Sequence, residues 1–151
     1  MLRTFLTKSS FRITTSTSFI THSRLPNYGR FNSTNSITSN IKKLNTLKEF
    51  QDSIKDPNKV SLIDFYATWC GPCKAISPVL EKYSAEFENV NFFKVDVDES
   101  PEVAGYCGIT AMPTFIFCKD GKGIAQIVGA NVRELKDNLE HFSKGGEEEK
   151  Q

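Results

Sequence analysis

Two cysteines, Cys70 and Cys73, stand three residues apart with only Gly71 and Pro72 between them. Such a pair of thiols can supply half of a metal site, close a structural disulfide or change oxidation state during a reaction. A purely structural disulfide is a poor explanation, because closing so short a loop removes little conformational entropy from the unfolded chain. Metal binding and redox chemistry remain to be compared.

The other potential metal ligands are poorly placed for a zinc site. Tetrahedral zinc usually takes a second cysteine pair or a histidine pair to complete its four ligands. Cys107 and Cys118 are eleven residues apart, and His22 and His141 lie toward opposite ends of the chain. We therefore expect no metal, and a redox pair is the interpretation that remains.

The flanking sequence predicts how the cysteines are positioned. Residues 60–67 (VSLIDFYA) are almost wholly apolar, which predicts a strand buried on both faces, and a helix is predicted from about Cys73 to Phe87. Cys70 then lies at the helix N-terminus, where free backbone N–H groups and the helix dipole stabilise a thiolate. We expect Cys70 to be the exposed nucleophile of low pKa and Cys73 to be the shielded second sulfur.

The rest of the chain predicts an α/β fold with a central mixed sheet and helices on both faces. A Lys-Asp-Gly turn between two apolar runs is a strong hairpin signal. The expected elements are a helix bearing Leu44, Leu47, Phe50 and Ile54, a buried strand 91–97, a short helix 101–106, hairpin strands 114–118 and 124–128, and a last helix starting near Asn131. Pro78 is expected to kink the helix that follows the cysteines. The predicted domain covers residues 41–143.

Residues 1–40 differ in composition from the rest of the chain. They hold five basic residues and no acidic one, with many Ser and Thr, whereas residues 41–151 hold 14 Lys and Arg against 18 Asp and Glu. No apolar block is long enough for a secretory signal or a membrane span. Such a leader is typical of a mitochondrial transit peptide, and a disordered basic N-terminus is the alternative. We expect cleavage near Arg30-Phe31, a location in the mitochondrial matrix and a disordered acidic tail at residues 144–151.

The segment around the cysteines resembles the active-site segment of the thioredoxin family. The matching motif is Trp69-Cys70-Gly71-Pro72-Cys73, and Ala111-Met112-Pro113-Thr114 resembles the cis-proline loop of that family. Lys119-Asp120-Gly121 and Val128-Gly129-Ala130 match its hairpin and the following turn. The resemblance runs from about Ile41 to Phe142 with no large insertion, and it implies the thioredoxin fold and a Cys70–Cys73 disulfide.

Asp64 is the one charged residue in the predicted strand 60–67. Burial there would raise the pKa of its carboxyl group. The matching residue of the family lies beneath the second cysteine and exchanges its proton. We therefore expect Asp64 to be the proton acceptor for Cys73, with Lys94 as its charge partner. A position facing solvent at a strand edge is the alternative for Asp64.

The resemblance also implies a surface for protein substrates. It makes the Met112–Pro113 bond cis, although most X–Pro bonds are trans, and it puts the Met112 backbone beside Cys70, where an extended substrate can pair with it. The expected substrate-binding residues form an apolar rim of Trp69, Gly71, Pro72, Met112, Pro113 and Gly129. Cys118 is expected to be a buried apolar residue and Cys107 a partly exposed one.

Together these features predict a protein-disulfide reductase in which Cys70 attacks a substrate disulfide and Cys73 then displaces the substrate. By the resemblance, a flavin thioredoxin reductase that uses NADPH regenerates the dithiol, the protein itself binds no cofactor, and peroxiredoxins are among the substrates. We expect a monomer with no nucleic-acid partner and no insertion into a membrane. A disulfide isomerase-like oxidoreductase and a thioredoxin-fold binding subunit without catalysis remain as alternatives.

Overall fold

The structure is a computed structural model that describes residues 39–145. The predicted leader, with its cleavage position near Arg30-Phe31, and the predicted acidic tail lie almost entirely outside this range. Within it, no helix combines the length and the apolar character needed to cross a membrane.

A five-stranded sheet lies at the centre of the described domain, with strand order β1-β3-β2-β4-β5. The strands are β1 (Lys42–Lys43), β2 (Val60–Tyr66), β3 (Val90–Asp96), β4 (Thr114–Lys119) and β5 (Lys122–Val128). β1, β3 and β2 are parallel, whereas β4 runs antiparallel to both β2 and β5. The predicted mixed sheet is confirmed.

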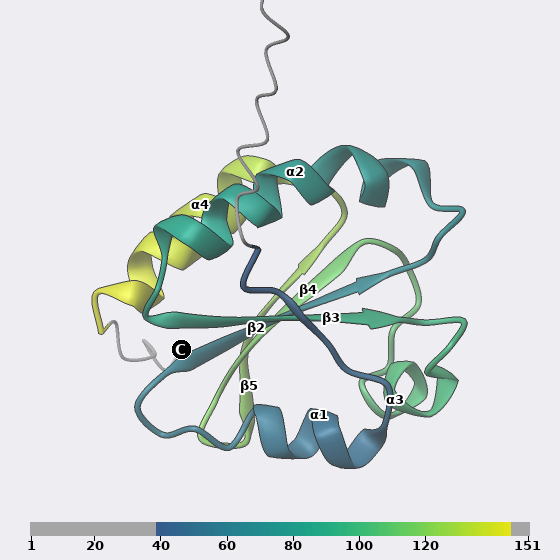
Figure 1. Ribbon diagram of the computed structural model, residues 1–151, viewed down its shortest axis with the longest axis horizontal. Coiled ribbons are helices and arrows are strands. Elements are labelled where there is room, and N and C mark those ends of the chain that lie inside the picture. The colour runs from purple at the N-terminus through teal and green to yellow at the C-terminus, as the bar shows by residue number, and fades with distance from the viewer. Residues whose placement is uncertain (1–38, 146–151) are drawn as a thin grey trace, which may run out of the picture. The chain divides into compact units, whose positions relative to one another are not determined.

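Four helices cover the two faces of this sheet (Figure 1). They are α1 (Leu47–Ser53), α2 (Gly71–Glu86), α3 (Pro101–Tyr106) and α4 (Val132–Ser143). α2 and α4 lie on one face, and α1 and α3 lie on the other (Figure 1). Each face has its own apolar cluster, with Leu62, Ile76 and Leu139 in the first and Ile63, Phe50 and Val103 in the second. Alternating side chains of β2 therefore anchor both layers.

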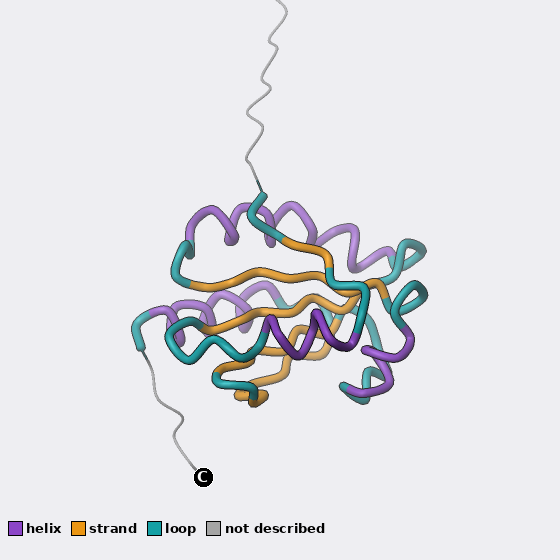
Figure 2. The backbone as a smooth tube through the Cα atoms, turned by 60° about the horizontal axis from the view of Figure 1, so that its bottom comes forward, coloured by secondary structure: helices purple, strands orange, loops and turns teal. Residues whose placement is uncertain are grey.

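The first part of the domain differs from the prediction, because Leu44 does not belong to a helix. Its N–H donates to the Lys94 carbonyl oxygen at 2.9 Å, which continues the pairing of β1 with β3. Figure 2 shows β1 as a short strand near the first described residues. α1 starts only after Thr46, whose hydroxyl oxygen accepts the Glu49 N–H at 3.2 Å while the Glu49 carboxylate accepts the Thr46 N–H at 3.3 Å. This capping box fixes where the helix begins.

The predicted hairpin is confirmed, with β4 and β5 joined at Asp120 and Gly121. Both residues have positive φ angles, 50° and 74°, as a tight two-residue hairpin turn requires. α2 begins two residues before the predicted start, at Gly71, because Cys70 caps it. Pro78 lies inside this helix. The consequence is that β2 leads directly, through Ala67–Cys70, into the helix that carries both cysteines.

Candidate active site

Cys70 and Cys73 are joined by a disulfide, and their Cα atoms are 5.3 Å apart. Cys70 is the N-cap of α2, and its sulfur accepts a hydrogen bond from the Cys73 N–H at 3.2 Å. Pro72 lies in the first turn, where a missing N–H costs no helical hydrogen bond. The helix therefore directs a backbone donor and the positive end of its dipole at the Cys70 sulfur, which is the setting that stabilises a thiolate.

The expectation that Cys70 is exposed is wrong for this disulfide form, whereas the expectation that Cys73 is shielded is confirmed. The exposed fractions of the two residues are 5% and 4%, respectively. Both pack with Ala67 in a small cluster against which Tyr66, Val97 and Met112 are packed. These neighbours come from loops and strand ends far apart in the sequence. The local pattern around the cysteines predicts that Cys70 caps the helix, but it does not predict that these distant residues bury Cys70.

Asp64 lies in β2 on the face covered by α2, because it is two residues from Leu62 and so points to the same side of the sheet. It is buried, with 8% exposure, so it does not face solvent at a strand edge. Burial raises the pKa of its carboxyl group to about 7, and the Lys94 charge has a smaller effect in the opposite direction. Across residues 39–145 its Oδ1 atom has no hydrogen-bond partner. A carboxyl group with this pKa can exchange a proton near neutral pH.

Lys94 is the cross-strand neighbour of Asp64 in the parallel β2–β3 pair. Its ammonium lies 6.0 Å from the centre of the Tyr66 ring. Within the described domain it forms no ion pair with Asp64 at 4.0 Å or less. The two side chains are thus near each other without direct pairing.

Two exposed apolar side chains belong to the segments that lead to the candidate site, namely Trp69 before Cys70 and Val128 at the end of β5. Trp69 and Val128 are 67% and 61% exposed, among the largest exposures of any apolar side chain in the described residues. The Trp69 Nε1–H donates to Asp98 Oδ2 at 2.8 Å, which holds the indole against the loop after β3. Sequence analysis missed Asp98 and Val128. The parallel order of β2 and β3 was the available signal for Asp98, because the loops after parallel neighbours meet at one sheet edge.

Two loops from the β4–β5 side join this surface. The Met112–Pro113 peptide bond is cis, and the Gly129 N–H donates to the Pro113 carbonyl oxygen at 2.7 Å. Gly129 has a φ of 94°, a region that side chains other than glycine rarely adopt. Met112 packs against the cysteine cluster. The structure thus brings the residues of the expected rim to one edge of the sheet.

The other two cysteines lie in the apolar layer beneath α1 and α3. Cys118 is buried in β4, and Cys107 is half-buried at the end of α3. Burial raises the pKa of the Cys107 thiol to about 11 and that of Cys118 to about 12, where the neighbouring Cys107 adds to the effect. Both thiols are therefore protonated at neutral pH.

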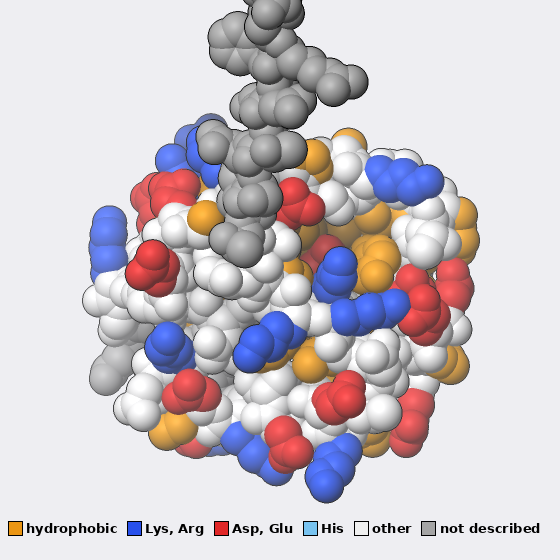
Figure 3. All heavy atoms as spheres, viewed as in Figure 1, with side chains coloured by type: hydrophobic (Ala, Val, Ile, Leu, Met, Phe, Trp, Pro, Cys, Tyr) orange, Lys and Arg blue, Asp and Glu red, His pale blue; other side chains and the backbone are white. Residues whose placement is uncertain are grey.

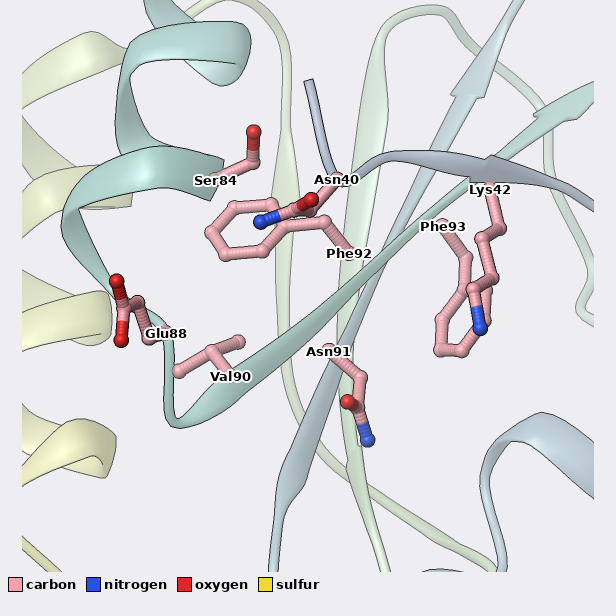
Figure 4. A pocket seen from close by; sticks show the side chains of 8 residues that line it. All are labelled: Asn40, Lys42, Ser84, Glu88, Val90, Asn91, Phe92 and Phe93. Atoms are coloured by element: carbon pink, nitrogen blue, oxygen red, sulfur yellow. The ribbon is translucent and has the colours of Figure 1, made fainter. Parts of the chain in front are cut away.

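A groove of about 400 Å³ lies away from the cysteines, between α2 and the β1–β3 edge (Figure 4). It is lined by Asn40, Lys42, Ser84, Glu88, Val90, Asn91, Phe92 and Phe93. Neither cysteine contributes to it. In the described part of the chain, no group of three or more His, Cys, Asp and Glu side chains is arranged to hold a metal ion.

Comparison with known proteins gives one consistent picture. The thioredoxin family profile matches residues 41–141. Thioredoxin-3, mitochondrial, from Saccharomyces cerevisiae is 50% identical over 101 residues, which are 67% of this chain and 79% of that protein. The crystal structure of mitochondrial thioredoxin 3 from Saccharomyces cerevisiae, in the oxidised form, superimposes with a TM-score of 0.64 at 50% identity, covering 70% of this chain and 97% of that one.

A second solved structure adds a biochemical setting. It concerns the thiol-resolving mechanism of a yeast mitochondrial 1-Cys peroxiredoxin via glutathione and thioredoxin systems. The matching chain in it is 49% identical, with a TM-score of 0.63, and the match covers 66% of this chain and 93% of that one.

Proposed function

The chain belongs to the thioredoxin family and is a protein-disulfide reductase, and from this premise we propose how its residues divide the reaction. Cys70 is the nucleophile, Cys73 is the resolving cysteine, and Asp64 is the proton acceptor. The observation that carries this assignment is the position of the Cys70 sulfur, which caps α2 and accepts the Cys73 N–H.

The reaction begins with the reduced protein. The Cys70 thiolate attacks one sulfur of the substrate disulfide, so that a bond forms between Cys70 and the substrate while the substrate disulfide breaks. The displaced substrate sulfur leaves as a thiolate and takes up a proton. The helix terminus stabilises the attacking anion, as P-loops and other helix starts stabilise bound anions.

Release of the substrate needs a second thiolate. The Cys73 thiol gives its proton to the Asp64 carboxylate and attacks the Cys70 sulfur. The Cys70–Cys73 disulfide forms, the second substrate sulfur leaves, and two electrons have passed from the dithiol to the substrate. A pKa of about 7 suits Asp64 to this task, because both of its protonation states are populated at neutral pH. The positive charge of Lys94 lowers the pKa of Asp64 and so opposes the effect of burial.

Substrates dock on the apolar rim of Trp69, Gly71, Pro72, Met112, Pro113 and Gly129. The exposure of Trp69 and the packing of Met112 against the cysteine cluster support this role. The Met112 backbone pairs with an extended segment of the substrate, in the manner of an added strand. Exposed apolar surface of this kind is typical of protein-binding sites.

A test of the assignment uses insulin disulfides as substrate and dithiothreitol as electron donor. The parent protein is expected to accelerate insulin reduction, and Cys70→Ser is expected to lower the rate to the uncatalysed background. Cys107→Ala serves as the matched control and should keep the parent rate. A Cys70→Ser variant as active as the parent would contradict the assignment of Cys70 as the nucleophile. A parent protein that does not accelerate insulin reduction at all would instead favour a binding subunit without catalytic function.

Electrons reach the dithiol from NADPH through a flavin thioredoxin reductase, and the protein works as a monomer. Family membership supports the first of these statements. Replacing dithiothreitol by NADPH and thioredoxin reductase in the same assay tests it separately, with NADPH consumption as the readout. If the protein reduced insulin with dithiothreitol but not with NADPH and thioredoxin reductase, a different electron donor would have to regenerate its dithiol.

Disulfide-containing proteins such as peroxiredoxins are the substrates, and the mitochondrial matrix is the location. Similarity to a mitochondrial thioredoxin and the acid-free composition of residues 1–40 support the location. N-terminal sequencing of the protein from purified mitochondria should give a start near Phe31. Recovery only outside mitochondria, or with Met1 intact, would contradict the proposal. If the reduced protein could not reduce an oxidised peroxiredoxin, peroxiredoxins would no longer be candidate substrates.

A further inference from the structure

We propose that Tyr66 is a positioning residue for the proton step: its ring attracts the Lys94 ammonium and so keeps this cation from forming an ion pair with Asp64. The inference deepens the proposed function, because it rests on Asp64 as the proton acceptor. Sequence analysis gave Tyr66 no role.

The three side chains share one face of the sheet. Asp64 and Tyr66 are two residues apart in β2 and therefore point to the same side, and Lys94 is the register partner of Asp64 in β3. Figure 4 shows Phe92 and Phe93 on opposite sides of β3, and Lys94 must follow Phe92. Since Phe92 packs in the cluster beneath α2, this face is the one that α2 covers.

Lys94 has a choice between two partners on this face. A cation directly opposite a carboxylate in adjacent strands is well placed for a cross-strand ion pair. Instead, the Lys94 ammonium lies 6.0 Å from the Tyr66 ring centre, within the range of cation–π attraction. Asp64 Oδ1 is left buried without a hydrogen-bond partner in the region that the structure describes. The ring thus competes with the carboxylate for the same cation.

The surrounding charges do not replace Lys94. Lys43 of β1 is the register partner of Lys94 on its other side, and its ammonium pairs with Glu99. In the view of Figure 3, Lys and Arg side chains lie on the surface over β1 and β3, with Asp and Glu side chains among them. Asp96 is buried opposite Tyr66, and its carboxylate accepts the Asp98 N–H at 3.0 Å.

Among residues 39–145, the remaining elements around Asp64 contribute no further cation that shifts its pKa. β4 places Phe115 opposite it, and β5 places Ile127 opposite Phe115. The charged side chains of α2 are exposed to solvent, namely those of Lys74, Glu81, Lys82 and Glu86. Lys94 is accordingly the charge that acts on the Asp64 carboxyl group.

The consequence concerns the strength of the base. An Asp64 carboxylate in a direct ion pair would have a lower pKa and would be a weaker proton acceptor for Cys73. With Lys94 held toward Tyr66, burial dominates and the carboxyl group titrates near neutral pH. Tyr66 therefore acts through Lys94 and touches neither substrate nor the transferred proton.

The test is a double-mutant cycle read by NMR titration of the Asp64 carboxyl group in the oxidised protein. Tyr66→Leu removes the ring and should lower the Asp64 pKa by about one unit as Lys94 moves to the carboxylate. Tyr66→Phe keeps the ring and should leave the pKa unchanged. In a Lys94→Met background, which itself should raise the pKa, Tyr66→Leu should have little effect. Tyr66→Trp, with a stronger ring, should raise the pKa and serves if the leucine variant does not fold.

Equal pKa values in Tyr66→Leu and Tyr66→Phe would overturn the inference. So would a shift in Tyr66→Leu that persists at full size in the Lys94→Met background, because the ring would then act through burial alone. The titration needs no substrate and no free thiol. Its failure is therefore distinct from failure of the proposed function, which would appear as loss of insulin reduction in the parent protein.

Discussion

The two pairs of cysteines in this chain have the same side chain and opposite expected reactivity. Cys70, at 5% exposure, is as buried as Cys118 at 3%, so burial does not separate them. The difference lies in the backbone, since Cys70 caps α2 and accepts an N–H, whereas Cys118 lies in a strand whose N–H groups pair within the sheet. The comparison teaches that a helix terminus, rather than access to solvent, distinguishes a reactive thiol here.

The second pair also lacks a proton acceptor. Desolvation is the cause that raises the pKa of the Cys107 thiol, and no carboxylate contributes. Cys73, in contrast, follows a strand that carries the buried Asp64 on the face beneath α2. Each of the following experiments changes one side of this contrast, and the largest expected effect comes first.

Cys73→Ser should convert a turning-over reductase into a trap. The Cys70 thiolate would still attack a substrate, but no neighbouring thiolate could displace it, so a mixed disulfide should accumulate and steady-state insulin reduction should fall to background. Non-reducing electrophoresis and mass spectrometry of the linked peptides measure this directly. Cys118→Ala is the matched control from the second pair and should turn over like the parent. Trapping through Cys107 or Cys118 would break the comparison.

Asp64→Asn should change both stability and the release step. The carboxyl group has a pKa of about 7 in the folded protein against an ordinary value of 3.8, so the unfolded chain loses this proton first. Between these two pH values the parent should lose stability as the pH rises, on the order of 4 kcal/mol in total, and Asp64→Asn should not. Denaturant unfolding at pH 4 and pH 8 measures the difference.

The same variant should also resolve mixed disulfides more slowly at neutral pH, because Cys73 loses its proton acceptor. Asp137→Asn, an exposed carboxylate of α4, is the control for both measurements. If the stability of Asp64→Asn and of the parent depended on pH in the same way, the Asp64 carboxyl group would have the same pKa in the folded and unfolded protein.

Cys118→Ser gives the smallest expected effect and sharpens the structural side of the contrast. A hydroxyl group in this apolar layer should cost about 1–3 kcal/mol of unfolding free energy without changing the rate of insulin reduction. Cys118→Ala separates the loss of packing from the cost of burying a polar group. A reductase rate that falls to a similar extent in both Cys118→Ser and Cys118→Ala, with both variants folded, would give this thiol a part in the reaction.

Much of the fold could be predicted from local patterns, because each pattern had a local physical cause. The apolar run of β2, the Asp120-Gly121 turn and the Asn131 cap of α4 depend on residues close together in the chain. β1 could not be predicted, since two exposed lysines carry no periodicity and become a strand only by pairing with β3. The Thr46 and Glu49 capping box was a readable signal that was missed, and it would have excluded Leu44 from α1.

The site shows the same division. The place of Cys70 at a helix start follows from its neighbours in sequence, but its burial depends on Met112 and Val97, which arrive from other loops. The position of Lys94 near the Tyr66 ring depends on the register between β2 and β3, which no local pattern specifies. Contacts that depend on strand register, or on loops far apart in the sequence, could therefore be identified only from the three-dimensional structure.

The central claim is that the start of α2 holds the Cys70 sulfur as a thiolate near neutral pH. The most direct measurement is the rate of iodoacetamide alkylation of each cysteine in the reduced protein as a function of pH, resolved by peptide mass spectrometry. The account predicts that Cys70 titrates clearly below the ordinary cysteine value of about 8.5, while Cys107 and Cys118 stay unreactive across the neutral range. A Cys70 thiol no more acidic than that value, or one that titrates together with Cys118, would contradict it.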